Sequence, residues 1–212
     1  MEVYGVKPKP FTKEWRQYFW EYYKLHTIGA VFAVILLIFT VSECKNQKNY
    51  DLQIDLITEN TVSEEVLDTL SDIVCENIDD VTGNGKSEAY ISFLDMSENS
   101  NPQITEAMYN KLLIETGYTE AFVFIVSQKF ADYLSDEGVL KPASDWTEME
   151  TYDGYCVSLK YCEILQNIGI DTSDLYLGIT ELRERDGKSA CEKNLPKQEN
   201  GIKFAKFLLN ER

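Results

Sequence analysis

The histidine content of the chain limits the catalytic chemistry that its residues could perform. The single histidine, His26, directly precedes a long apolar run near the amino terminus. Serine–histidine–aspartate sites, cysteine–histidine sites and histidine-based zinc sites all need a histidine beside their other residues. None of these is expected in residues 43–212. We therefore predict a protein that is not an enzyme, with no catalytic residue, no metal site and no cofactor.

Two glycine-containing motifs suggest ligand sites, and their spacing argues against both. Gly-Lys-Ser occurs at 85–87 and at 187–189, but a P-loop needs a further glycine where the chain has Asp80 and Leu182. Residues 80–85, DVTGNG, resemble the start of a calcium loop. The twelfth position of that loop is Ile91 instead of a bidentate glutamate, which favours a glycine-rich turn.

The cysteines allow disulfides without indicating a disulfide framework. Cys75 falls on the apolar side of a predicted helix and is expected to be a buried thiol. Cys156 and Cys162 are six residues apart, so they form either a disulfide or two separately packed thiols, and we favour the thiols. The remaining two are Cys191 and Cys44, the latter at the edge of the apolar run.

Polar residues that follow the predicted strands are the candidates for ligand binding. Loops at the carboxyl ends of parallel strands are where an α/β fold binds its ligand. For the segment 95–101, an ordinary solvated loop is the favoured alternative. The candidates in these loops are Thr61, Asp95, Glu98, Asn101 and Ser127.

Hydrophobic periodicity predicts the elements that would position these residues. Strands are expected at 50–58, 89–94 and 121–126, the last apolar throughout and therefore buried on both faces. Helices are expected at 62–77 behind a Thr61–Glu64 capping box, at 102–116, and at 128–137, capped by Ser127 and ended by Gly138. Strand, helix and strand in alternation predict a three-layer α/β domain with a mostly parallel sheet.

The rest of the chain is less regular. Segment 141–153 is expected to be a surface crossover, in which Trp146 and Tyr152 either tuck onto the sheet, as we favour, or form a contact surface. Beyond it we expect a strand at 155–159, a short helix at 160–168 and a strand at 174–182. A loop containing Pro196 at 183–200 and a helix at 202–210 complete the chain.

Residues 27–42, TIGAVFAVILLIFTVS, form an uncharged apolar run that predicts one transmembrane helix. The aromatic segment before it, within residues 1–26, is typical of a membrane interface and extends the helix. A buried core helix and a cleavable signal peptide are the alternatives. Glu43 argues against the signal peptide and against lipid attachment at Cys44, because both require small residues there.

Charge predicts the orientation of this helix. Residues 1–26 contain five basic and three acidic residues, whereas 43–212 contain the other 15 basic and 33 acidic residues, a net charge of −18. The positive-inside rule places residues 1–26 in the cytoplasm and the domain 45–212 outside the cell membrane. So acidic a domain is not expected to bind nucleic acid.

The segment YFWEYYKLHTIGAVFAVILLI followed by YDLQIDLIT resembles uncharacterised single-pass membrane proteins of Gram-positive bacteria. Residues 107–144 are similar to one lobe of type 2 periplasmic solute-binding proteins; the residues that match the pattern of that lobe are Phe130, Leu134, Gly138, Leu140 and Pro142. The resemblance implies a single-lobe, solute-binding-like extracytoplasmic domain. It transfers no ligand residue, and the 141–155 connection is too short to hold a second lobe.

These observations lead to three functional hypotheses. The first is a non-enzymatic, membrane-anchored binding or scaffold protein, accessory to a membrane complex such as a transporter, because the short polar link 45–49 holds the domain near the bilayer. The second is a small-solute sensor or binding module, which requires a concave pocket with convergent polar groups. The third, an envelope hydrolase, requires two carboxylates in one cleft.

Overall fold

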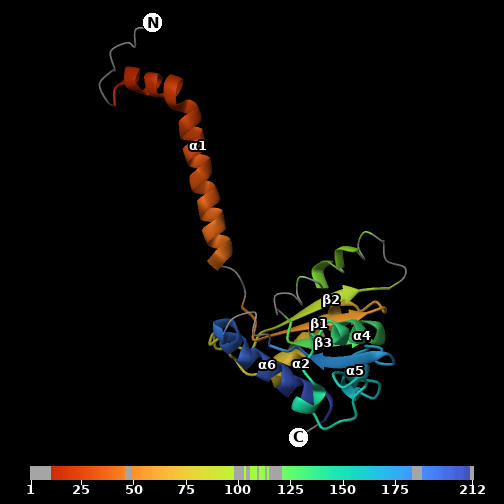
Figure 1. Ribbon diagram of the computed structural model, residues 1–212. Helices are drawn as coiled ribbons and strands as arrows, with labels where there is room; N and C mark the ends of the chain where they lie inside the picture. Colours follow the sequence, from red (N-terminus) through yellow and green to blue (C-terminus); the bar gives the residue numbers. More distant parts are fainter. Residues whose placement is uncertain are drawn as a thin grey trace. The chain divides into compact units, whose positions relative to one another are not determined.

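A computed structural model describes residues 11–45, 49–97, 103, 106–108, 110–112, 114, 121–182 and 188–210. The chain divides into two compact units, Met1–Lys48 and Asn49–Arg212. Figure 1 shows the elements of both. Both hydrophobic clusters of buried residues lie in the second unit, which therefore has a core of its own.

The described part of the first unit is dominated by one helix, α1 (Lys13–Lys45). Its window Tyr23–Thr40 is long and apolar enough to cross a membrane, as a transmembrane anchor or a signal sequence is. The aromatic segment forms a ladder of rings at successive turns, in which the centroids of Trp15 and Phe19 are 5.3 Å apart and those of Phe19 and Tyr23 are 5.5 Å apart. Figure 1 shows that α1 bends near its amino-terminal end.

The second unit is built on a five-stranded sheet with strand order β2-β1-β3-β5-β4. β1 is parallel to both β2 and β3, whereas β5 is antiparallel to both of its neighbours, β3 and β4. The strands are β1 (Leu52–Thr58), β2 (Ala89–Asp95), β3 (Val123–Ser127), β4 (Val157–Ser158) and β5 (Leu175–Ile179).

The sheet is therefore mixed. The expectation of a mostly parallel sheet holds for β1, β2 and β3 and is corrected for β5, which is antiparallel. The helix before β5 is α5 (Glu163–Asn167), which at ~1.5 Å per residue is only ~7.5 Å long. A five-residue strand is about twice as long, so α5 does not carry the chain back along the sheet as a parallel crossover does. The chain instead enters β5 from the edge at which β1 and β3 end.

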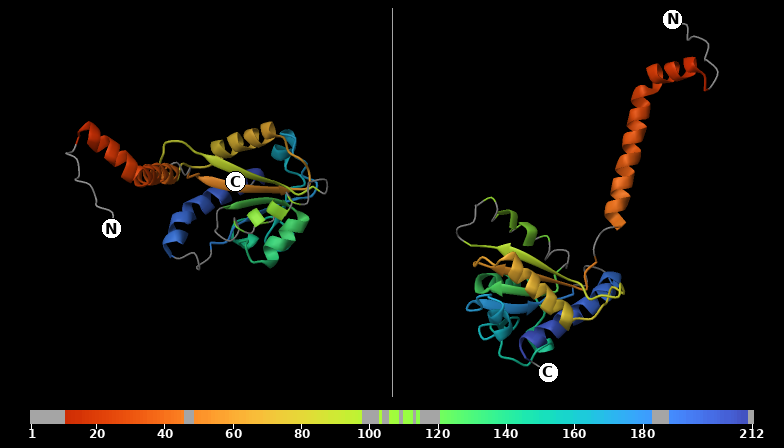
Figure 2. Two further views of the ribbon diagram at one scale, coloured as in Figure 1. Left: turned by 90° about the horizontal axis from the view of Figure 1, so that it is seen from above. Right: turned by 180° about the vertical axis from the view of Figure 1, so that it is seen from behind.

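Helices cover both faces of the sheet, as expected for a three-layer α/β domain. Leu52, Ile54 and Leu56 of β1 share one hydrophobic cluster with α2 (Glu64–Asn77), α5 and α6 (Lys188–Leu208). Ile57 and the β3 residue Phe124 join a second cluster with α4 (Gln128–Asp136) and the helical residues around Leu112. α2 and α6 are in contact within the first cluster. Figure 2 gives two further views of the helices and the sheet.

Three local predictions need correction. Residues 188–200 are helical and not a loop, because α6 runs through Pro196 and packs its buried residues Gln198 and Asn200 against the domain. The capping box is wrong: α2 begins after Ser63, and neither this residue nor Ser127 before α4 makes a side-chain cap bond. The predicted strand 155–159 is reduced to the two residues of β4.

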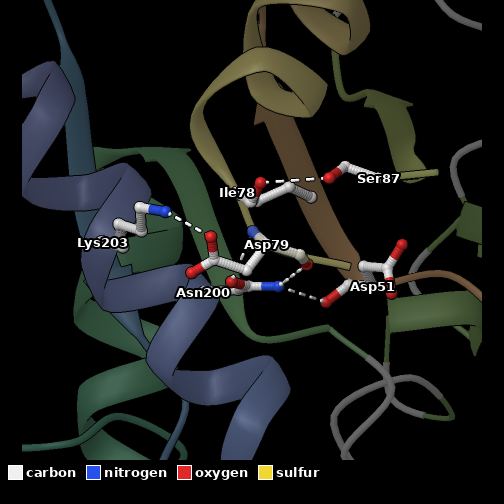
Figure 3. A network of polar contacts seen from close by, with 6 residues as sticks. All are labelled: Asp51, Ile78, Asp79, Ser87, Asn200 and Lys203. Atoms are coloured by element: carbon white, nitrogen blue, oxygen red, sulfur yellow. Dashed lines mark hydrogen bonds and ion pairs between the residues drawn. The ribbon is translucent and has the colours of Figure 1, made fainter. Parts of the chain in front are cut away.

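A polar network at the amino-terminal edge of the sheet attaches α6 to the loop after α2 (Figure 3). The buried amide of Asn200 accepts a hydrogen bond from the Asp79 N–H at 3.0 Å and donates to the Asp79 carbonyl at 2.8 Å and the Asp51 carbonyl at 3.3 Å. The buried carboxylate of Asp51 accepts backbone N–H bonds from Val81, Thr82 and Glu88. These bonds satisfy groups inside the fold, so we assign them a structural role.

Candidate functional site

The three strand ends singled out by the sequence lie in one row. The pairing of β1 with β2 places Thr58 opposite Asp95. In the pairing of β1 with β3, Ile57 lies opposite Val126, so the next position brings Thr58 level with Ser127. Ser127 is in turn paired with Leu175, the first residue of β5. The ends of β1 and β3 and the start of β5 therefore meet at one edge.

This edge includes the topological switch point of the sheet. From β1 the chain crosses to β2 on one side, and from β2 it passes to β3 on the other side of β1. α2, which follows β1, packs on one face of the sheet, and α4, which follows β3, packs on the other. The loops after β1 and β3 therefore diverge and leave a crevice. Open α/β sheets bind their ligands at this position.

A cavity of about 130 Å³ lies between the ends of β1 and β3 and the start of β5. Drug-sized pockets begin near 300 Å³, so this cavity suits a ligand of a few non-hydrogen atoms or one end of a longer molecule. Its lining is almost entirely polar and includes three carboxylic acids. The lining residues are Thr58, Glu59, Asn60, Ser127, Asp171, Asp174 and Leu175.

Hydrogen bonds hold the two loops that form its walls. The Thr58 hydroxyl oxygen accepts a bond from the Asn60 N–H at 3.1 Å, which tightens the turn after β1. The Asn60 amide donates to Asp171 at 3.4 Å and so links this turn to the loop before β5. Asp171 also accepts the Ser173 N–H at 3.0 Å. The backbone N–H and the hydroxyl of Ser173 hold the pKa of Asp171 below its usual value, which keeps this carboxylate charged.

Ser127 is a buried lining residue whose hydroxyl has unused hydrogen-bonding capacity. The residue is buried, and its hydroxyl oxygen has no hydrogen-bond partner among the residues that the structure describes. Ser127 precedes α4, where a serine usually caps the helix, but its side chain makes no cap bond. A buried hydroxyl without a partner is unfavourable unless something else binds it, so Ser127 indicates a ligand position in the cavity.

A larger groove of about 550 Å³ adjoins the cavity and shares Asp171 with it. Its walls include Tyr161, whose side chain is 85% exposed, and Lys160, whose ammonium nitrogen lies 5.8 Å from the centroid of the Tyr161 ring. A ligand longer than the cavity can extend past Asp171 into this groove.

Of the five candidate residues, the cavity includes Ser127. Thr61 is exposed and does not line it. Asp95 lies at the same edge at the end of β2, where it accepts the Ser97 N–H at 2.9 Å, and it is not a lining residue. Glu98 and Asn101 lie outside the described residues.

Sequence reasoning missed most of the cavity. Glu59 and Asn60 belong to the loop after the first strand, which the sequence had named as a possible ligand position because it follows a strand. Asp171 and Asp174 were missed because they precede the last strand, and in a parallel sheet that position would lie at the opposite edge. The signal that could have located Asp171 and Asp174 is the shortness of the helix before the last strand, which favours an antiparallel strand.

The other motifs fold into local structure. The Asp80 carboxylate accepts backbone N–H bonds from Gly83, Asn84 and Gly85, which lower its pKa and make a closed turn. Trp146 is buried as favoured, whereas Tyr152 is 40% exposed and its hydroxyl accepts a bond from the Gln128 amide.

Within the described part of the second unit, the four cysteines are thiols and form no disulfide. Cys156 and Cys162 are buried as separate thiols, as favoured from the sequence. Cys75 is only partly buried, which corrects the expectation of a buried thiol. Within the described ranges, no group of three or more histidine, cysteine or acidic residues is arranged to hold a metal ion.

Comparison of the chain with protein-family models, with curated proteins and with solved structures gives no match.

Proposed function

We propose that this protein is a membrane-anchored binding module for a small solute, with the ligand held at the carboxyl edge of β1 and β3. The observation that supports the proposal is the buried, unpartnered hydroxyl of Ser127 in a polar cavity at the switch point of the sheet. α1 serves as the anchor and places the domain Asn49–Arg212 outside the cytoplasm, as the charge distribution predicts.

The geometry favours binding over hydrolysis. The hydrolase hypothesis asks for two carboxylates in one cleft, and the cavity contains three. The lowered pKa of Asp171 suits a charged carboxylate that binds a ligand and does not suit the general acid that hydrolysis needs. The role of scaffold accessory to a membrane complex stays a prediction from the short link after α1, and it is compatible with solute binding.

The test is a binding screen on the full chain in lipid nanodiscs. Saturation-transfer NMR would be run with a set of small polar solutes of up to about eight non-hydrogen atoms, in equal numbers of cationic, neutral and anionic compounds. Asn60→Phe fills the cavity mouth from an exposed position, so it blocks the site without disturbing the core. Asn167→Phe, at the exposed end of α5, is the matched control.

We expect at least one solute to bind the wild-type chain and the Asn167→Phe variant and to lose its signal with Asn60→Phe. A set in which no solute binds contradicts the proposal, as does binding that Asn60→Phe leaves unchanged.

A further inference from the structure

We propose that the solute carries a primary ammonium group, which the cavity binds through its carboxylates and the Ser127 hydroxyl. The inference rests on the proposed function and specifies the chemical class of the ligand. The cavity is lined by the carboxyl groups of Glu59, Asp171 and Asp174.

Within the described ranges, no lysine or arginine forms an ion pair with these carboxylates. Among the described residues, the ion pairs are those of Lys141 and Lys203, and none of them involves a cavity carboxylate. Lys160 is the basic residue of the adjoining groove, and its ammonium lies over the Tyr161 ring. The cavity therefore concentrates negative charge in a domain that is itself strongly acidic.

Helix ends do not reverse this charge. α4 begins next to the cavity after Ser127, and a helix amino terminus carries about half a positive charge. Three carboxylates outweigh one such end by about sixfold in charge. An anionic ligand is therefore disfavoured at this position.

The arrangement also favours an ammonium group over a bare metal ion. A metal ion needs several carboxylates gathered within coordination distance, and the described residues contain no such group. A primary ammonium has three N–H donors that point in different directions, and it can reach separate acceptors. The Ser127 hydroxyl oxygen accepts no hydrogen bond from the residues that the structure describes, and the Asp171 carboxylate lines the same cavity from the loop before β5.

Ethanolamine, ethylene glycol and glycolate test the charge of the ligand. The three compounds have nearly the same size and share a hydroxyl group, but one end is cationic, neutral or anionic. NMR titration of the full chain in nanodiscs at low salt gives the dissociation constants. We expect ethanolamine to bind in the micromolar to millimolar range reached by so small a ligand, at least tenfold more tightly than ethylene glycol, and glycolate not to bind.

Variants distinguish the groups that contact the ammonium. Asp171→Asn and Asp174→Asn each remove one charge without changing the shape of the side chain. We expect each variant to raise the dissociation constant of ethanolamine by about fivefold to tenfold. Asp136→Asn is the matched control, because this carboxylate lies at the exposed far end of α4. Ser127→Ala removes a hydroxyl that has no partner in the described structure, so it should weaken binding about fivefold while leaving the melting temperature unchanged or higher.

The two proposals fail in different ways. If ethylene glycol or glycolate binds as tightly as ethanolamine and Asn60→Phe abolishes that binding, the cavity is a solute site and the ammonium inference is wrong. Failure of ethanolamine to bind also overturns the inference, and the broader solute screen then decides the proposed function separately. A Ser127→Ala variant that unfolds at lower temperature would show that the hydroxyl has a structural role instead.

Discussion

Replacement of Asn200 by leucine should separate the structural network at the amino-terminal edge of the sheet from the proposed ligand site at the other edge. Asn200 is 2% exposed, and its amide bonds the Asp79 N–H, the Asp79 carbonyl and the Asp51 carbonyl. Leucine has the same number and branching of side-chain heavy atoms but neither donates nor accepts, so all three backbone groups lose the bond to this side chain.

The magnitude follows from these three groups. A buried backbone group without a partner costs about 1–3 kcal/mol, and we take about 1 kcal/mol each because water can reach Asp79 at the surface. The total is about 3 kcal/mol, reduced by the ~0.5 kcal/mol that leucine gains over asparagine in helix propensity. At about 2–4 °C per kcal/mol for a domain of this size, the melting temperature should fall by about 5–10 °C.

Urea unfolding of the fragment 49–212 measures this change, because both hydrophobic clusters lie within it. Trp146 is its single tryptophan and is buried, so its fluorescence reports the loss of the core. Glu199→Ala, on the exposed side of the same helix, is the matched control and should change the free energy of unfolding by less than about 0.5 kcal/mol. If Asn200→Leu is as stable as that control, the network does not hold α6 to the domain and the reasoning fails.

Three further predictions concern the cysteines, the helix α6 and the anchor. Burial raises the pKa of Cys156 to about 12 and also raises the pKa of Cys162. At pH 8 iodoacetamide should therefore modify only the half-buried Cys75 and Cys191 in the native fragment, and all four thiols in urea, as mass spectrometry would show. Rapid labelling of Cys156 in the native fragment would contradict this. Pro196→Ala restores a helix N–H donor, and urea unfolding should show a gain of about 1–2 kcal/mol; a loss would mean that α6 depends on the proline. The full chain should stay in the membrane after carbonate extraction with its carboxyl-terminal domain accessible to external protease, whereas a mature chain cleaved near residue 42 would identify a signal sequence.

The local elements followed from the sequence because they are encoded in neighbouring residues. The alternation over 50–58 and the apolar run 121–126 each gave a strand in the expected place, and the helices after them are present. The apolar run at 27–42 likewise marked α1. Hydrophobic period and chain breaks such as Gly138 are sufficient for this level of structure.

Pro196 and Ser63 show where local rules were overruled. Proline predicts a break, yet α6 continues through it because burial of Gln198, Asn200 and Phe204 against the domain outweighs one lost hydrogen bond. The Thr61 cap predicted from the local pattern is likewise wrong, because Ser63 is the residue before α2 and it makes no side-chain cap bond.

The sequence alone determined the charge, the apolar helix, the absence of a histidine beyond residue 26 and the strand ends that could hold a ligand. Only the tertiary structure decided which residues share the cavity, because this depends on strand direction. An antiparallel β5 brings Asp171 and Asp174 to the edge where β1 and β3 end, beside Thr58 and Ser127. The direction of β5 is fixed by its pairing with β3, about 50 residues earlier in the chain, and hydrophobic periodicity, which is the same for parallel and antiparallel strands, does not record it.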